Sequence, residues 1–124
     1  MILGIGIDMI EIERIEKAAD KAAFLARIFT EGELRLYEER GRNAAVLAGC
    51  FAGKEAVAKA LGTGFSGFMP GDIEILRDEA GKPYAVLKNG ALARLQAIGG
   101  ETVHLSITNS RDVAAAFVII ATAE

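Results

Sequence analysis

Residues suited to binding a phosphorylated ligand lie close together in the segment 51–64, FAGKEAVAKALGTG. Glu55 and Lys59 are four residues apart, so both side chains would project from one face of a helix. The Gly62-Thr63-Gly64 turn that follows has permissive φ angles, and its backbone N–H groups suit a phosphate. Together these groups indicate a metal and phosphate site. The alternative is a buried, alanine-rich helix with an ordinary salt pair that ends at a glycine.

A second acid, Asp8, follows the apolar segment 2–7, ILGIGI, which we predict to be a strand buried on both faces. Gly4 and Gly6 would allow another backbone to pack closely against this strand. Asp8 would be either the N-cap of a following helix or a ligand at the end of a core strand. If Asp8 and Glu55 converge, the pair suits Mg²⁺, which takes one or two protein carboxylates, several waters and phosphate oxygens.

Other catalytic chemistries have less support. The sequence contains one histidine and one cysteine, which excludes a histidine–cysteine zinc site and an intramolecular disulfide. The single cysteine also favours a reducing cytoplasm. His104 and Ser106 are two residues apart on one face of a predicted strand, which is typical of the polar face of a sheet. No G-x-S-x-G elbow accompanies them.

The composition limits the class of protein. With 124 residues, of which 52% are hydrophobic, we expect a single domain spanning 1–124. A net charge of −3 argues against a dedicated nucleic-acid binder. No apolar run approaches the roughly 18 residues that a membrane span needs. The start, MILGIGID, lacks the basic region of a signal peptide.

The elements that must position these groups follow one another without a repeat or a linker. Three helices are expected before the central one: 9–23, 24–29 and, after the capping box formed by Thr30 and Glu33, one that extends to about residue 40. The central helix, capped by Asn43, would span 44–61, and the glycine-rich segment 62–72 would be a functional loop.

The second half of the chain predicts mainly strands. They are expected at 72–77, 84–87, 103–108 and 113–121, with a short helix that Asn89 caps and that ends near residue 97. The predicted fold class is therefore α+β, with an N-terminal strand, a helical block and an antiparallel sheet. In the loop, Phe65, Phe68 and Met69 are apolar enough to cover a ligand or a neighbouring subunit.

A basic stripe is expected on the helix 9–23. Arg14, Lys17 and Lys21 follow one another at spacings of three and four residues, so their side chains would lie along one face. In an acidic protein such a stripe suits an acidic partner. The alternative is an ordinary solvated helix face.

These motifs resemble the bacterial holo-[acyl-carrier-protein] synthases, a group of small 4′-phosphopantetheinyl transferases. The resemblance covers essentially the whole chain, and its motifs are GIGIDMIEIERI at 4–15, FAGKEAVAKALGTG at 51–64, HLSITNSRDVAAAFVI at 104–119, FTEGEL at 29–34 and GKPY at 81–84. It implies a Mg²⁺-dependent transfer of the phosphopantetheine arm of coenzyme A (CoA) to a serine of apo acyl carrier protein. Adenosine 3′,5′-bisphosphate would be the other product, and the reaction would support fatty acid synthesis.

The resemblance also implies roles for particular residues. Asp8 and Glu55 would bind Mg²⁺, and the phosphates of CoA would be held by Lys59, Gly62, Thr63 and Gly64. Either Glu55 or a water held by the metal and Asp8 would accept the serine proton. A homotrimer is implied, with each active site shared between neighbouring subunits. Two further groups are implied: Thr108 and Asn109 at the CoA pocket, and Arg14, Lys17, Lys21 and Arg27 at the carrier-protein surface.

Three positions depart from the family pattern. Cys50 replaces a common arginine and Asn109 a common histidine, both near the CoA nucleotide in the family. Losing one charge-assisted hydrogen bond, of roughly 1.5–3 kcal/mol, would weaken CoA binding by about tenfold or more, unless Lys54 or another subunit compensates. Gly53, where alanine is usual, would cost the helix about 1 kcal/mol. The rival hypotheses are a non-catalytic relative that only binds carrier protein or nucleotide, and a structural oligomerisation domain.

Overall fold

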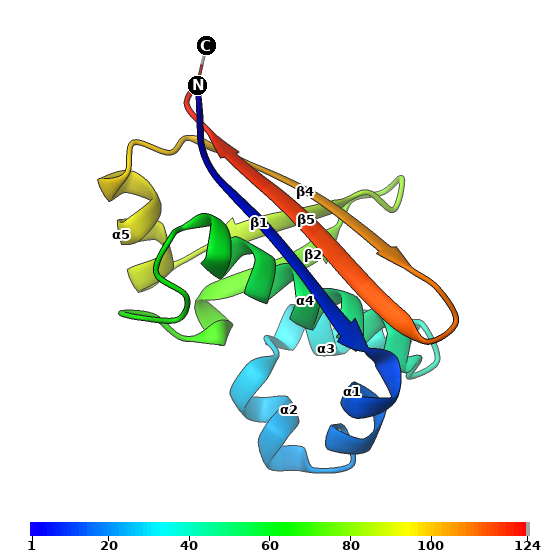
Figure 1. Ribbon diagram of the computed structural model, residues 1–124. Coiled ribbons are helices and arrows are strands. Elements are labelled where there is room, and N and C mark those ends of the chain that lie inside the picture. Colours follow the sequence, from blue (N-terminus) through cyan, green and yellow to red (C-terminus); the bar gives the residue numbers. More distant parts are fainter. Residues whose placement is uncertain (124) are drawn as a thin grey trace.

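The computed structural model describes residues 1–123, and Figure 1 traces the chain through its helices and strands. The first half contains β1 (Ile2–Glu11), α1 (Ile12–Ala18), α2 (Ala22–Ile28), α3 (Glu31–Glu39) and α4 (Ala44–Ala60). The second half contains the 3₁₀ helix η1 (Pro70–Asp72), β2 (Ile73–Arg77), β3 (Pro83–Leu87), α5 (Asn89–Ala97), β4 (Thr102–Asn109) and β5 (Val113–Ala121). The α+β class predicted from the sequence is confirmed. Within the described residues, no helix is long and apolar enough to cross a membrane.

The strands form two antiparallel sheets. In the larger sheet the order is β1-β5-β4, so the first strand of the chain pairs with the last, and β2 and β3 form a separate hairpin. The predicted strands in the second half are confirmed, and each boundary agrees to within one residue. The pairing of β1 with β5 was not predicted, because alternation along a strand identifies its faces but not its partner.

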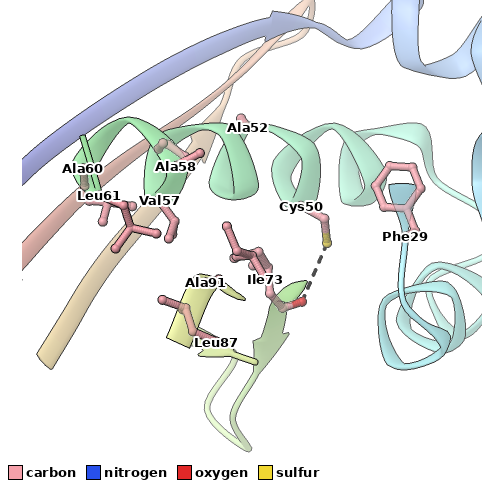
Figure 2. Packing of buried hydrophobic residues seen from close by; sticks show 14 of the residues in the cluster. Phe29, Cys50, Ala52, Val57, Ala58, Ala60, Leu61, Ile73, Leu87 and Ala91 are labelled. Atoms are coloured by element: carbon pink, nitrogen blue, oxygen red, sulfur yellow. Dashed lines mark hydrogen bonds between the residues drawn. The ribbon is translucent and has the colours of Figure 1, made fainter. Parts of the chain in front are cut away.

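Helix α4 is the centre of the core and contacts β1 and β5 on one side and β2 on another. The predicted cap is confirmed, since Asn43 Oδ1 accepts a hydrogen bond from the Ala45 N–H at 2.9 Å. Figure 2 shows Val57 of α4 on the side of the helix where Ile73 of β2 lies, with Leu61, the C-cap, at the end of the helix. An element covered on several sides is expected to be apolar around most of its circumference, and the alanine-rich sequence of α4 meets that requirement.

Two glycines of β1 allow the backbone of α4 to approach it. A Cβ atom on Gly4 would lie 1.9 Å from the carbonyl oxygen of Ala60, and one on Gly6 would lie 1.8 Å from that of Ala56. This confirms the prediction that another backbone packs at these glycines and identifies that backbone as α4. The close approach places β1, which carries Asp8 within the strand rather than at its end, directly beside the helix.

The prediction that the first strand is buried on both faces is wrong for the single chain. Gly6 is buried against α4, whereas Ile5, Ile7 and Met9 are 59%, 63% and 70% exposed. The physical reason is the alternation of side chains along a strand, since α4 covers only one of the two faces. We call Ile5, Ile7, Met9 and the exposed Phe117 of β5 the outer apolar face.

The predicted helix 9–23 is also wrong in its boundaries. Residues 9–11 continue β1, where Met9 pairs with Ala115 and Glu11 with Val113. The helix that follows, α1, ends at Ala18, and α2, which starts at Ala22, corresponds to the short helix predicted at 24–29 and confirms it. Because α1 begins at Ile12 with Glu11 as its N-cap, the interpretation of Asp8 as a helix cap is wrong. Pairing with β5 satisfies the backbone groups of residues 9–11 and overrides their helical periodicity.

The other predicted caps have different outcomes. The capping box is confirmed: Thr30 Oγ1 accepts from the Glu33 N–H at 3.2 Å, and Glu33 Oε1 accepts from the Thr30 N–H at 2.8 Å. The Asn89 cap is wrong, because Lys88 is the N-cap of α5. Asn89 is instead the first residue of α5, with φ +50°, and its Nδ2 donates to Asp72 Oδ1 at 2.9 Å.

Candidate active site

Strand β1 and helix α4 bring Asp8 and Lys59 together. Lys59 Nζ donates to Asp8 Oδ1 at 3.1 Å and to the carbonyl oxygen of Ile7 at 3.1 Å. The Asp8 side chain is 16% exposed and the Lys59 side chain 53% exposed. The ammonium group is therefore held against strand β1 and stays open to solvent, where a ligand could reach it.

Glu55 lies one turn before Lys59 on the same helix and belongs to this group. Its partial burial, followed by repulsion from the Asp8 carboxylate, raises the pKa of Glu55, and the Lys59 ammonium opposes the rise. Because Lys59 contacts Asp8 and Glu55 lies one turn before Lys59, the two carboxylates are near each other, although β1 and α4 are distant in sequence. The structure thus brings together Asp8, Glu55 and Lys59, the residues singled out for catalysis. Their catalytic roles stay a prediction.

The pair of carboxylates fits a divalent cation. Two like charges that raise each other's energy are relieved when a cation lies between them. Mg²⁺ needs only one or two protein carboxylates and takes its other ligands from water and phosphate oxygens, which the exposure of this site permits. Among residues 1–123, no group of three or more His, Cys, Asp and Glu side chains suited to a metal was found.

The glycine turn after α4 has the predicted conformation but not the predicted free amides. Gly62 and Gly64 have φ angles of +85° and +61°. The Gly62 N–H donates to the carbonyl oxygen of Lys59 at 3.0 Å, and the Gly64 N–H donates to that of Ala58 at 3.2 Å. The expectation that these two amides are available to a phosphate is therefore corrected, because they close the end of the helix. Thr63 lies exposed between them.

Arg94 lies beside this turn, and the sequence did not single it out. Its Nε donates to the carbonyl oxygen of Leu61 at 2.9 Å, and one terminal nitrogen would be 3.5 Å from a Cβ on Gly62. A cation at the end of a helix complements its dipole. The sequence offered one indication of a role for Arg94, because it is the one basic residue within α5. Its spacing along the chain did not connect it to the glycine turn.

A cavity of about 280 Å³ opens next to Glu55. Its apolar lining comes from α2, α4 and the glycine-rich loop, and consists of Phe24, Ile28, Phe51, Phe65 and Pro70. Arg27, Lys54 and Glu55 supply the polar part. Phe65 packs edge to face against the buried Phe68, with their ring centroids 5.6 Å apart, whereas Met69 is 62% exposed. The loop therefore forms one wall of an apolar pocket that ends at a carboxylate.

Arg14, Lys17 and Lys21, which were expected on one helix, are divided between two, and Arg27 lies on the second. Arg14 and Lys17 are on α1, Lys21 is the N-cap of α2, and Arg27 is in the last turn of α2. Lys17 Nζ lies 3.1 Å from Glu13 Oε1, in an exposed ion pair. Of these residues, Arg27 lines the cavity beside Glu55. The single stripe is wrong as a geometric description, because the break before α2 changes the direction of the chain.

The residues predicted for the CoA pocket on β4 lie away from Asp8. Asp8 pairs with Ala116 and so faces α4, whereas Thr108 and Met9 both pair with Ala115 and lie on the opposite side of the sheet. Asn109 is exposed at the end of β4, and its Nδ2 donates to the carbonyl oxygen of Ser110 at 3.3 Å. One chain does not bring Thr108 to the Asp8 carboxylate.

Cys50 is buried in the core and does not face a surface pocket. It is 3% exposed, and its Sγ lies 3.8 Å from the carbonyl oxygen of Ile75, the contact that the dashed line marks in Figure 2. Packing explains the glycine at position 53, because a Cβ added there would lie 3.1 Å from Cγ1 of Ile75. Lys54 is 1% exposed and is paired with Glu33, so the expectation that it compensates for a missing arginine is wrong.

We predict that the Cys50 thiol does not react in the folded protein. Burial raises its pKa to about 12, so at pH 8 about one molecule in ten thousand carries the reactive thiolate. With the disulfide reagent DTNB at pH 8, the native protein should release almost no thiolate chromophore, whereas protein in guanidinium chloride should release one equivalent within minutes. Since Cys50 is the one cysteine, rapid release from the native state would contradict the burial described here.

Comparisons with known proteins identify relatives along nearly the whole chain. The family model of the 4′-phosphopantetheinyl transferase superfamily matches residues 4–118. A holo-[acyl-carrier-protein] synthase of Clostridium tetani is 47% identical over 121 residues, which covers 97% of this chain and 96% of the relative. A crystal structure of the Bacillus anthracis holo-(acyl-carrier-protein) synthase in complex with CoA (3′,5′-ADP) has a TM-score of 0.83 and 39% identity, and covers 99% of each chain. The Helicobacter pylori synthase in complex with coenzyme A has a TM-score of 0.82 and 30% identity, over 94% of this chain and 99% of that one.

Proposed function

This chain belongs to the 4′-phosphopantetheinyl transferase superfamily, and we propose that it is the enzyme that converts apo acyl carrier protein into its holo form. It transfers the 4′-phosphopantetheine arm of CoA to a serine hydroxyl, in support of fatty acid synthesis in the cytoplasm. The observation that carries this proposal is the convergence of Asp8, Glu55 and Lys59 at the meeting point of β1 and α4. Relatives that are holo-[acyl-carrier-protein] synthases match the chain over nearly its full length.

The reaction requires three things of the site. A bond forms between the serine oxygen and a phosphorus of the CoA diphosphate, the bond from that phosphorus to the leaving phosphate breaks, and the serine proton is removed. Asp8 and Glu55 would hold Mg²⁺, which supplies charge stabilisation to the phosphate oxygens. Lys59, whose ammonium is already fixed by Asp8 and the Ile7 carbonyl, adds a second positive charge at the same place. Either Glu55 or a water held by the metal and Asp8 would accept the serine proton.

The outer apolar face supports a homotrimer with shared active sites. Ile5, Ile7, Met9 and Phe117 leave a strip of large apolar side chains on one side of the sheet, and strips of this kind commonly mark an interface. Thr108 lies on the same side, away from Asp8 of its own chain. If it contributes to a CoA pocket, that pocket needs the Asp8, Glu55 and Lys59 of a neighbouring subunit.

The surface next to the cavity suits the carrier protein. Arg14, Lys17, Lys21 and Arg27 provide positive charge along α1 and α2 for an acidic partner. Arg27 also lines the apolar cavity beside Glu55, so a partner that contacts it would bring its serine near the carboxylates. The division of the basic residues between two helices makes this surface wider than a single helix face.

The proposed function is tested by weighing the carrier protein. We expect that incubation with CoA and Mg²⁺ raises the mass of apo acyl carrier protein by about 340 Da, the mass of the phosphopantetheine arm, and that EDTA prevents the gain. Apo carrier protein whose acceptor serine is replaced by alanine is the matched control. No gain at millimolar CoA from a folded sample would contradict transfer and would favour a relative that only binds.

A further inference from the structure

A buried ammonium group connects four separate parts of the chain beside the cavity. Lys54 on α4 is 1% exposed, and its Nζ lies 2.8 Å from Oε1 of Glu33 on α3, which is 0% exposed. The same nitrogen donates to the carbonyl oxygen of Pro70 at 3.0 Å and to that of Ile73. A lysine ammonium has three N–H groups, so each has an acceptor and none is left to bind an incoming ligand.

Both carboxylate oxygens of Glu33 accept hydrogen bonds from the backbone. Its Oε1 also accepts from the Thr30 N–H at 2.8 Å, and its Oε2 accepts from the Ile75 N–H at 2.8 Å. The carboxylate thus joins the start of α3 to strand β2, and Lys54 extends this connection to the first residue of η1. Within residues 1–123, no buried side-chain nitrogen or oxygen lacks a hydrogen-bond partner, so the network is complete.

The contact between Lys54 and Pro70 is important because Pro70 belongs to a segment that lines the cavity. Pro70 and Phe65 line the cavity that ends at Glu55, the residue after Lys54. The Met69 N–H donates to Asp72 Oδ2 at 3.1 Å, which closes the start of η1 locally. One ammonium group therefore ties the helix that carries Glu55 to the segment that lines the cavity with it.

We propose that Lys54, held by Glu33, is a positioning residue for the transfer reaction, which keeps the Phe65–Pro70 wall of the cavity in place beside Glu55. This inference rests on the proposed function, because it assumes that a substrate occupies the cavity during transfer. Lys54 acts through the wall and does not contact the reacting atoms.

A purely stabilising role explains these contacts less well. Removing two charges from water costs about as much as their attraction returns, so apolar side chains of similar volume often give equal or greater stability. Apolar packing would not define a direction for the carbonyl oxygens of Pro70 and Ile73, whereas hydrogen bonds do. The network therefore specifies where the wall lies, and a displacement of about 1 Å at such a site can cost about a hundredfold in rate.

The test compares two core variants of the full-length protein. The double variant Lys54→Met, Glu33→Gln removes both charges together, so that no buried ion is left without a partner. Val118→Ala, at a fully buried position of β5 that lies outside the cavity lining, serves as a control for general loss of packing. For each variant, hydrogen–deuterium exchange of residues 65–72 is followed by mass spectrometry, and kcat and KM for CoA and for apo carrier protein are measured.

The proposal expects a specific pattern in the double variant. Exchange in 65–72 should rise at least about tenfold, and kcat per folded molecule should fall about 10- to 100-fold with KM for CoA nearly unchanged. Val118→Ala should leave both quantities near the wild-type values. Wild-type kcat in the double variant, or the same fall in kcat for Val118→Ala, would overturn the positioning role. An inactive wild-type enzyme would instead overturn the proposed function, so the two failures are distinguishable.

Discussion

Replacing either Asp8 or Glu55 by alanine is expected to lower the Mg²⁺-dependent rate of phosphopantetheine transfer by about a thousandfold. The proposed site has two carboxylates for the metal, and charge stabilisation by a bound metal is worth several kcal/mol in the transition state, which corresponds to about this factor. The rate is followed by the mass gain of the carrier protein, and Mg²⁺ affinity is followed separately by calorimetry. Both the rate and the affinity should fall in each variant.

The same substitutions should leave folding almost intact. Asp8→Ala removes one partly exposed ion pair with Lys59, and ion pairs of this kind contribute about 1 kcal/mol or less to the free energy of unfolding. Glu31→Ala is the matched control, because it also removes one carboxylate from an exposed ion pair, with Arg35, and neither residue lines the cavity. Wild-type activity in both Asp8→Ala and Glu55→Ala would contradict the proposed metal-binding role of these residues and favour a structural oligomerisation domain.

Replacing Gly6 by alanine is expected to lower the free energy of unfolding by at least about 4 kcal/mol, a large part of the roughly 5–15 kcal/mol of a typical domain. The added Cβ would lie 1.8 Å from the carbonyl oxygen of Ala56, and this atom belongs to a helix backbone that has no rotamer to change. The strand and the helix must therefore separate, which removes packing along β1 and moves Asp8 away from Lys59. Urea unfolding followed by circular dichroism measures the loss.

Gly71→Ala provides the control for this prediction. A Cβ at Gly71 would meet no atom within 4 Å, and its φ angle is outside the range that disfavours L-residues. The stability of this variant should lie within about 0.5 kcal/mol of the wild type. If Gly6→Ala were as stable as Gly71→Ala, the close packing of β1 on α4 could not be the contact that positions Asp8.

Local signals in the sequence predicted many of the elements. The capping box at Thr30, the Asn43 cap and the alternation from Val103 to Thr108 all involve neighbouring residues, and the structure contains each of them. The signals failed where a distant element decided the outcome. Residues 9–11 have helical periodicity, but β5 supplies strand partners for them, and that competition is not visible in a window of the sequence.

The site shows the same division between local and distant information. Glu55 and Lys59 could be placed on one helix face from their spacing, and Gly4 and Gly6 indicated a close backbone neighbour. Convergence with Asp8 depended on which backbone that neighbour is, and only the fold identifies it as α4. Lys54 lies next to Glu55 in sequence, but its role depends on Glu33 and Pro70, which no spacing rule connects to it.

The pairing of the first strand with the last has a consequence for biosynthesis. Asp8 leaves the ribosome early, whereas Ala116, its partner in β5, is made near the end of the chain. At about 5–20 residues per second, the wait lasts roughly 5–20 seconds. During this time β1 has no strand partner, and its isoleucines are open to chaperones and to other nascent chains. The sheet that holds β1 is therefore complete only after synthesis is nearly finished, and a truncated chain that lacks β5 would leave β1 without its strand partner.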